Sequence, residues 1–157
     1  MGSKARCIQS RRARCGTKPT REPKRTHSAD CVNPAVYDAG ALVAADRNER
    51  SVWAEHRVRL EAGVIPRVPA PVVAQVSRSG RQAQLRRFLR GCDIADFREA
   101  DAHAAGRLLA RSRTSDVVDA AVVVLAMERT AEIVTADRDD IAHLLAAVRI
   151  SLPIVDT

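Results

Sequence analysis

Several residue types and motifs that would indicate particular functions are absent from this chain of 157 residues. No apolar run approaches the ~18 residues that a membrane span needs, and the N-terminal region lacks the apolar stretch of a signal peptide. The four cysteines include no CxxC pair, which argues against a zinc site. We therefore expect a cytoplasmic protein with reduced thiols and no membrane contact.

Aromatic residues and lysines are also scarce. Aromatics make up 3% of the chain, so stacking of bases on aromatic rings is not expected to drive nucleic-acid binding. All three lysines lie in the first 33 residues. The rest of the chain therefore lacks the lysine that receiver domains and haloacid-dehalogenase-like phosphatases place beside a phosphorylated aspartate. No GxxxxGK sequence is present, which excludes a P-loop NTPase. The histidines of the predicted helices do not have the HExxH spacing of a zinc site, and we predict that they are surface or core residues: His56, His103 and His143.

The net positive charge is confined to one end of the chain. Residues 1–33 hold nine Lys or Arg and two acids, whereas residues 34–157 hold 17 Arg and 17 acids. Few apolar side chains occur in residues 1–33, so burial cannot offset the conformational entropy lost on folding. We predict a basic, disordered N-terminal extension over residues 1–33, able to hold phosphates loosely, and one domain over residues 34–157.

Short apolar runs alternate with segments of helical periodicity throughout residues 34–157. Strands are predicted over residues 35–38, 65–68, 92–97, 131–137 and 152–156. Helices are predicted over residues 39–45, 49–63, 69–78, 81–91, 99–111, 115–128 and 139–148. This alternation predicts an α/β domain with a central, mostly parallel sheet of about five short strands flanked by helices.

Four aspartates stand where predicted elements begin or end. Asp38 follows the first strand, Asp137 closes the fourth, and Asp116 and Asp119 lie at the start of the apolar helix before it. Ligands of open parallel sheets bind beyond the carboxyl ends of the strands, so these acids converge if strands one and four are neighbours. The spacing of Asp116 and Asp119 places both on one helix face. Grouped carboxylate oxygens of this kind suit Mg²⁺ or Mn²⁺.

Each acid also has a structural interpretation. An acid in the first turn of a helix interacts favourably with the helix dipole, which accounts for Asp116 and for Asp139 as an N-cap. That explanation serves Asp119 less well, because we place Asp119 deeper in the helix, where the most apolar stretch begins and a carboxylate needs a partner. No capping role is expected for Asp38.

Three short sequences together resemble the PIN-domain ribonucleases of the VapC toxin type. They are VYDAGAL around Asp38, DAAVVVLA beginning at Asp119, and VTADRDD around Asp137. The resemblance covers residues 34–157, and the Arg-, Ala- and Val-rich composition is similar to that of high-GC actinobacterial members. It implies a PIN-like three-layer fold and metal-dependent hydrolysis of RNA phosphodiester bonds. Asp38, Asp119 and Asp137 would then be ligands of Mg²⁺ or Mn²⁺, with Asp116 as a further ligand or as a residue that positions water, and Asp139 as a weaker candidate.

One position departs from the family pattern. Gln75 stands in the predicted 69–78 helix where such enzymes usually have a glutamate. An amide keeps a carbonyl oxygen but carries no charge, so the site should hold a cation less tightly, with Asp116 as the candidate for the missing acid. The alternative is a catalytically impaired PIN-like module that binds RNA or an antitoxin without cutting.

Partners are indicated by one basic segment and by the resemblance. Five arginines and no acid occur between residues 78 and 90, namely Arg78, Arg81, Arg86, Arg87 and Arg90. Leu85, Phe88 and Leu89 would face inward there, leaving most arginines outward as a solvated face or as contacts to an RNA backbone. The resemblance further implies an RNA substrate, a cognate antitoxin protein and a homodimer.

Overall fold

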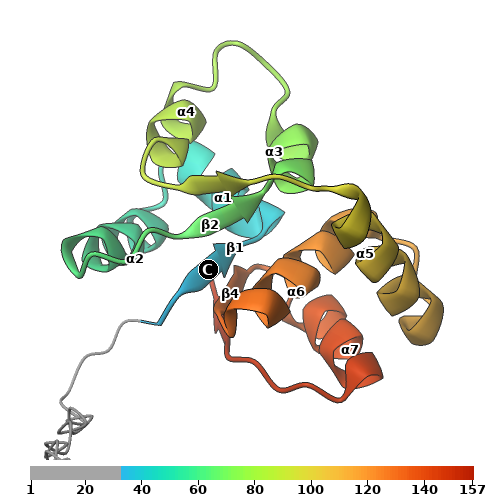
Figure 1. Ribbon diagram of the computed structural model, residues 1–157. Coiled ribbons are helices and arrows are strands. Elements are labelled where there is room, and N and C mark those ends of the chain that lie inside the picture. The colour runs from blue at the N-terminus through green and yellow to red at the C-terminus, as the bar shows by residue number, and fades with distance from the viewer. Residues whose placement is uncertain (1–32) are drawn as a thin grey trace, which may run out of the picture. The chain divides into compact units, whose positions relative to one another are not determined.

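The computed structural model describes residues 33–157, which form a five-stranded sheet flanked by seven helices (Figure 1). The extension predicted for residues 1–33 therefore falls, except for its last residue, outside the described residues. The strands are β1 (Ala35–Tyr37), β2 (Arg67–Pro69), β3 (Asp93–Ala95), β4 (Glu132–Thr135) and β5 (Ile154–Asp156).

All strand pairs of this sheet are parallel, in the order β3-β2-β1-β4-β5. The chain runs from β1 outward to β2 and β3, then returns to the other side of β1 to form β4 and β5. Tyr37 of β1 pairs with Val134 of β4, so the first and fourth strands are neighbours, as predicted. The strand order reverses between them, and this switch point is where open α/β sheets bind ligands.

The helices form a layer on each face of the sheet. They are α1 (Ala39–Asp46), α2 (Arg50–Glu61), α3 (Ala70–Val76), α4 (Ala83–Leu89), α5 (Glu99–Ser112), α6 (Val117–Arg129) and α7 (Arg138–Val148). Helix α1 packs against α2, α3 and α4, and α6 packs against α5 and α7 (Figure 1). The predicted three-layer α/β fold is confirmed.

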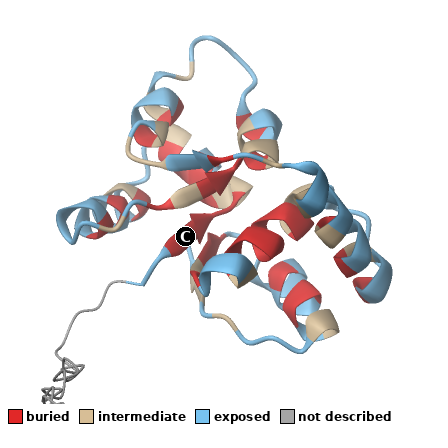
Figure 2. Ribbon diagram, viewed as in Figure 1, coloured by how far each residue is buried: buried red, intermediate tan, exposed pale blue. Residues whose placement is uncertain are grey.

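Burial on both faces explains the continuous apolar residues of β1 and of the middle of α6. All three residues of β1 are buried, and α6 is buried without a break from Ala120 to Ala126 (Figure 2). A parallel sheet covered on both faces requires continuous apolar strands, which alternation of apolar and polar residues would not provide. The apolar helix that begins beside Asp119 is therefore a core helix in contact with β1, β2 and β4.

Helix α2 is attached to the sheet by polar side chains. The Tyr37 hydroxyl lies 3.2 Å from Nδ1 of His56, and Arg59 donates to Glu132 of β4 over 2.6 Å. Burial, followed by the nearby charge of Arg59, lowers the pKa of His56 to about 4, so this ring is neutral at pH 7. His56 is thus a core residue, as predicted.

The second and third strands differ from the prediction. Strand β2 begins at Arg67 and not at residue 65, because Pro66 has no N–H to donate and Ile65 is 61% exposed. Strand β3 is confined to Asp93–Ala95 at the edge of the sheet, where it pairs with β2 alone. Among residues 33–157, no helix combines the length and the apolar character required to cross a membrane.

Candidate functional site

Asp38 occupies the first position after β1 and is held by three hydrogen bonds. Its backbone N–H donates to Val134 O (3.0 Å), while its carboxylate accepts from the Ala39 N–H (2.6 Å) and from the Thr135 hydroxyl (2.7 Å). Asp38 is therefore the N-cap of α1, a role that was not expected from the sequence. Burial raises its pKa, against the opposing effect of the bonds from Thr135, Ala39 and Gly40.

Thr135 connects the two strand ends at the switch point. Its buried hydroxyl donates to Asp38 and accepts the backbone N–H of Asp137 over 2.9 Å. We did not assign Thr135 a role from the sequence, although it is the first residue of the Thr-x-Asp that closes β4. The sequence signal that could have identified Thr135 is a hydroxyl side chain two residues before an acid at the end of a predicted strand.

Gly40 allows the start of α1 to approach the loop after β4. A Cβ atom at this position would lie 2.6 Å from Cβ and 2.7 Å from N of Ala136. Both distances are shorter than a non-bonded contact tolerates, so only glycine permits this approach. Gly40 therefore keeps the segment that carries Asp38 close to the segment that carries Asp137.

The start of α6 brings two more carboxylates to this edge of the sheet. Asp116 is the N-cap, and its Oδ1 accepts the N–H groups of Val118 (2.8 Å) and Asp119 (3.2 Å). Asp119 is half-buried in the first turn, and its carboxylate accepts no hydrogen bond from the residues that the structure describes. The prediction that Asp119 lies deeper in the helix was wrong, because α6 begins at Val117.

Four other carboxylates act on the charge of Asp119. Its pKa is raised to about 7, first by burial and then by the negative charges of Asp116, Asp38, Asp140 and Asp137. Charges raise a pKa in this way only when they lie nearby. The edge defined by these five aspartates is referred to below as the acidic edge.

The loop after β4 corrects one assignment. Helix α7 begins at Arg138, and its N-cap is Asp137, whose Oδ1 accepts the Asp140 N–H over 3.4 Å. Asp139 is therefore not the N-cap that we predicted, but an exposed first-turn residue. The neighbouring Asp140 is an acid whose charge acts on Asp119.

Asp156 is a further acid at the carboxyl end of the sheet, and sequence analysis did not identify it. It ends β5 and pairs in register with Thr135. Arg138 donates to both of its carboxylate oxygens, at 3.0 and 3.2 Å from Nε, and also to Ile154 O. The charge of Asp156 is thus compensated, in contrast to the charges of the acidic edge.

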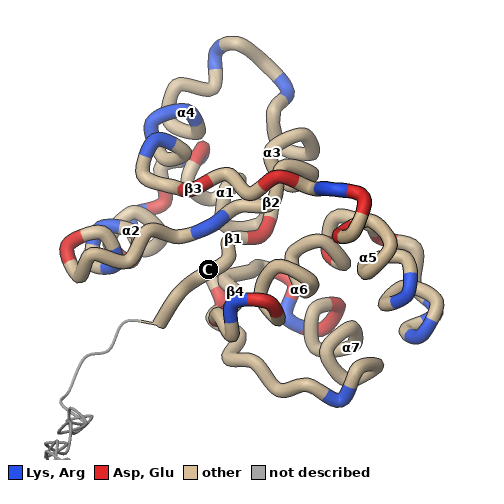
Figure 3. Tube along the Cα trace, viewed as in Figure 1, with Lys and Arg blue, Asp and Glu red and all other residues tan. Residues whose placement is uncertain are grey.

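The remaining predicted residues lie on the α3–α4 side. Gln75 is exposed on α3, where it lines a cavity together with Ala39, the neighbour of Asp38. Leu85 and Phe88 are buried, as predicted. The five predicted arginines are all exposed, and basic residues gather on α4 and on the loop before it (Figure 3). The guanidinium of Arg87 lies 5.2 Å from the centre of the Trp53 ring, so this arginine is partly engaged within the protein.

The chemistry of the acidic edge fits a divalent cation, although a complete ligand set is not preformed. Within residues 33–157, no three His, Cys, Asp or Glu side chains are grouped closely enough to hold a metal ion. The donors are nonetheless hard carboxylate oxygens, the type that Mg²⁺ and Mn²⁺ prefer. Their mutual repulsion, expressed in the raised pKa of Asp119, is what a cation would relieve.

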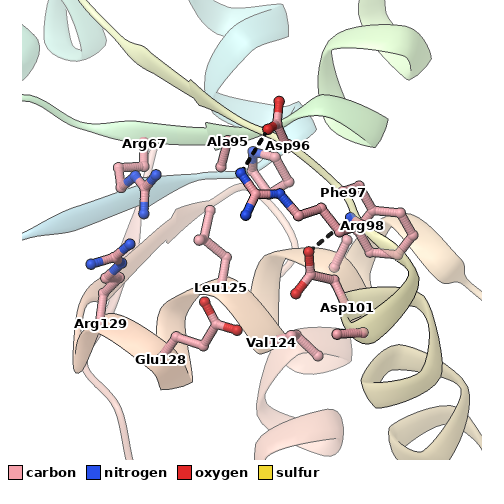
Figure 4. Close-up of a pocket in the computed structure, with 13 residues that line it drawn as sticks. Arg67, Ala95, Asp96, Phe97, Arg98, Asp101, Val124, Leu125, Glu128 and Arg129 are labelled. Atoms are coloured by element: carbon pink, nitrogen blue, oxygen red, sulfur yellow. Dashed lines mark hydrogen bonds and ion pairs between the residues drawn. The ribbon is translucent and has the colours of Figure 1, made fainter.

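A separate cavity of about 270 Å³ lies between the ends of β2 and β3 and helices α5 and α6 (Figure 4). None of the acidic-edge residues lines this cavity. Two of its three acids are engaged: Asp96 accepts from the Arg98 guanidinium over 2.9 Å, and Asp101 accepts the Arg98 backbone N–H over 2.8 Å. This cavity therefore does not supply ligands to the acidic edge.

Comparison with known proteins supports the fold. No protein-family model and no curated protein matches the sequence. Among solved structures, VapBC2 from Rickettsia felis bound to a DNA fragment from its promoter superposes with a TM-score of 0.59 and 18% identity, over 78% of this chain and 98% of that one. PAE2754 from Pyrobaculum aerophilum superposes with a TM-score of 0.54 and 14% identity, over 79% of this chain and 90% of that one. The chain thus shares its α/β fold with these structures.

Proposed function

We propose that this protein is a divalent-metal-dependent ribonuclease that hydrolyses RNA phosphodiester bonds, with Asp38, Asp119 and Asp137 holding Mg²⁺ or Mn²⁺. The observation that carries the proposal is the convergence of carboxylates at the β1–β4 switch point. Support comes from the fold shared with VapBC2 of Rickettsia felis. A binding function for RNA alone would not require several uncompensated acids, because such acids repel phosphates.

The acids differ in how they can serve this reaction. A bound cation would polarise the phosphoryl oxygen and lower the pKa of its water. Asp38 is suited to be a metal ligand whose position does not change, because Thr135 and Ala39 hold its carboxylate by hydrogen bonds. Asp119 is free to rotate toward a cation, since it accepts no hydrogen bond from the described residues. Asp116 uses one carboxylate oxygen for capping and can orient the attacking water with the other.

We further propose that the chain is the toxin of a type II toxin–antitoxin pair, restrained by a cognate antitoxin, forming a homodimer and acting in the cytoplasm. The support is the fold shared with VapBC2. Gln75 and Asp139 remain candidates for the surroundings of the metal site, and the arginines between residues 78 and 90 for contacts to the RNA backbone.

Cleavage of RNA by the full chain tests the proposal. Wild type and Asp119→Asn are compared on several structured RNAs in Mg²⁺, in Mn²⁺ and in EDTA, with Glu61→Gln on α2 as the control. We expect wild type and Glu61→Gln to cleave only with metal, and Asp119→Asn to lose cleavage. Cleavage in EDTA, or full activity of Asp119→Asn, would reject the proposed site.

A second candidate function is favoured by Gln75. Its neutral amide removes one charge relative to the usual glutamate, which would leave a PIN-like module that binds RNA or an antitoxin without turnover. Gln75→Glu separates the two functions, because Gln75 is exposed and the change should not disturb folding. Mn²⁺-dependent cleavage that appears only in Gln75→Glu identifies wild type as an impaired enzyme. Cleavage that is already present in wild type excludes this second function.

A further inference from the structure

A groove begins directly beside the acidic edge and runs between α1, α3 and α4. Its volume is about 400 Å³, and Ala39, the neighbour of Asp38, lies at one end of α1 in its lining. Arg47, just past the last residue of α1, lies at the other end, about 12 Å away along the helix at 1.5 Å per residue. The groove thus extends from the residue next to Asp38 to a guanidinium group, and the carboxylates of the acidic edge lie outside its lining.

Two polar side chains in the wall of this groove, Gln82 and Asp46, are hydrogen-bonded within the protein. The side-chain oxygen of Gln82, Oε1, accepts the backbone N–H groups of Arg78 (2.8 Å) and Ser79 (3.0 Å), and its Nε2 donates to Asp46 (3.0 Å) and to Val76 O (3.0 Å). The other oxygen of Asp46 accepts the Leu85 N–H over 3.2 Å. Both oxygens of the only carboxylate in the groove lining are therefore used within the protein.

Three polar side chains of the groove remain available to a ligand. Gln75, Arg47 and Arg78 are exposed, and none of them forms a side-chain hydrogen bond or ion pair within the described part of the chain. Apolar side chains, including Leu42, Val76 and Leu85, line the space between them. The groove therefore offers an apolar surface, one amide with a donor and an acceptor, and two cationic groups.

We propose that this groove binds the nucleotide next to the scissile phosphodiester of a single-stranded RNA, with Gln75 contacting the base edge and Arg47 and Arg78 contacting phosphates. The inference rests on the proposed ribonuclease function. An amide can pair with a base edge through both its donor and its acceptor. Base edges are accessible in single strands, whereas the deep groove of duplex RNA hides them. Guanidinium groups match phosphate oxygens in geometry and charge.

Binding by the full chain in EDTA tests the two arginines without cleavage. The probes are fluorescent eight-nucleotide homopolymers of each base, and affinity is measured by anisotropy over a range of salt concentrations. Arg47→Ala and Arg78→Ala should weaken binding, and each should reduce the slope of log affinity against log salt by about 0.7, the value for one phosphate contact of a single strand. Arg107→Ala on α5 is the matched control, because Arg107 is also exposed and the change removes the same charge. All variants retain the same N-terminal residues.

The role of Gln75 is tested by base preference. Gln75→Met keeps the volume of the side chain and removes its hydrogen-bonding groups. The preference of wild type among the four homopolymers should fall by roughly tenfold in this variant, while the salt slope stays unchanged. A loss of affinity that is equal for all four bases would show that Gln75 does not contact a base edge.

The outcomes distinguish this inference from the proposed function. Unchanged affinity and base preference in all three groove variants would overturn the proposal that the groove binds RNA, even if metal-dependent cleavage that requires Asp119 is observed. Groove-dependent binding without cleavage by wild type would instead reject the ribonuclease and retain the RNA site. Tighter, groove-dependent binding of a polyglutamate peptide would assign the groove to an acidic protein segment and overturn the RNA proposal.

Discussion

Thr135 donates its hydroxyl to Oδ2 of Asp38 over 2.7 Å, across a separation of 97 residues in the sequence. The same hydroxyl accepts the Asp137 N–H, so one buried side chain fixes the ends of both strands at the switch point. The positions of Asp38 and Asp137 are thus coupled through Thr135.

Replacement of Thr135 by valine should reduce metal-dependent cleavage by about 10- to 100-fold, the usual effect of losing a residue that orients a metal ligand. Valine keeps the shape of threonine but cannot donate to Asp38, whose pKa should rise further. Thr135→Ser restores the donor and should recover most of the activity. Equal activity of Thr135→Val and wild type at saturating Mn²⁺ would show that the hydroxyl does not position Asp38.

Gly40→Ala should separate the start of α1 from the loop after β4. The new Cβ would meet Ala136 at 2.6 Å, and such overpacking costs about 1–3 kcal/mol of unfolding free energy. Gly106→Ala on α5 is the matched control, since it adds the same methyl group to a helix in open space. Urea unfolding should show a lower free energy of unfolding for Gly40→Ala, and a free energy of unfolding higher by up to about 1 kcal/mol for Gly106→Ala. The same response in both variants would contradict the close approach.

The raised pKa of Asp119 predicts a pH-dependent cost to stability. Between its ordinary value of 3.8 and about 7, the folded protein retains a proton that the unfolded chain has lost, so the free energy of unfolding falls as pH rises. Asp119→Asn removes this cost. In EDTA, the variant should match wild type near pH 4 and exceed it above pH 7. The gain should be about 1 kcal/mol, after solvent screening of a half-exposed carboxylate is allowed for.

Thermal or urea unfolding from pH 4 to pH 8 measures this difference. A constant offset between Asp119→Asn and wild type over the whole range would mean that Asp119 has an ordinary pKa. Added Mg²⁺ should make wild type more stable than Asp119→Asn above pH 7, because the cation stabilises wild type and the variant lacks one of its ligands.

The buried pair of Arg59 and Glu132 should contribute strongly to stability. The Arg59 side chain is 8% exposed and the Glu132 side chain 12%, so Glu132→Ala leaves a cation buried without its main partner. We expect a loss of about 3–5 kcal/mol in the free energy of unfolding. Glu61→Ala, which breaks the exposed pair with Arg57, should cost less than about 1 kcal/mol. A similar small loss for both variants would show that water reaches Arg59.

Sequence pattern was sufficient to predict the architecture of residues 34–157. Burial on both faces leaves continuous apolar strands such as β1, and helical periodicity marks the segments between them. The positions of Asp38 and Asp137 at strand ends then placed both acids at the same edge. Errors were confined to boundaries, as at Pro66, where the missing N–H delays the start of β2.

The contacts within the site could not be predicted in the same way. Capping depends on where the first turn closes, and a shift of two residues transferred the cap of α7 from Asp139 to Asp137. The bond from Thr135 to Asp38 depends on strand register, which no single segment specifies. The pairing of Arg138 with Asp156 likewise requires β5 to lie beside β4.

Binding of Mn²⁺ to the full chain tests most directly whether the acidic edge is a metal site. Enhancement of water proton relaxation reports bound Mn²⁺ without requiring turnover or a known RNA target. Wild type and Glu61→Gln should bind Mn²⁺ with the same affinity, and Asp38→Asn and Asp119→Asn should each weaken binding by at least about tenfold, since each removes a charged ligand. Binding that is absent from wild type, or unchanged in both aspartate variants, would contradict the assignment of Asp38 and Asp119 as metal ligands.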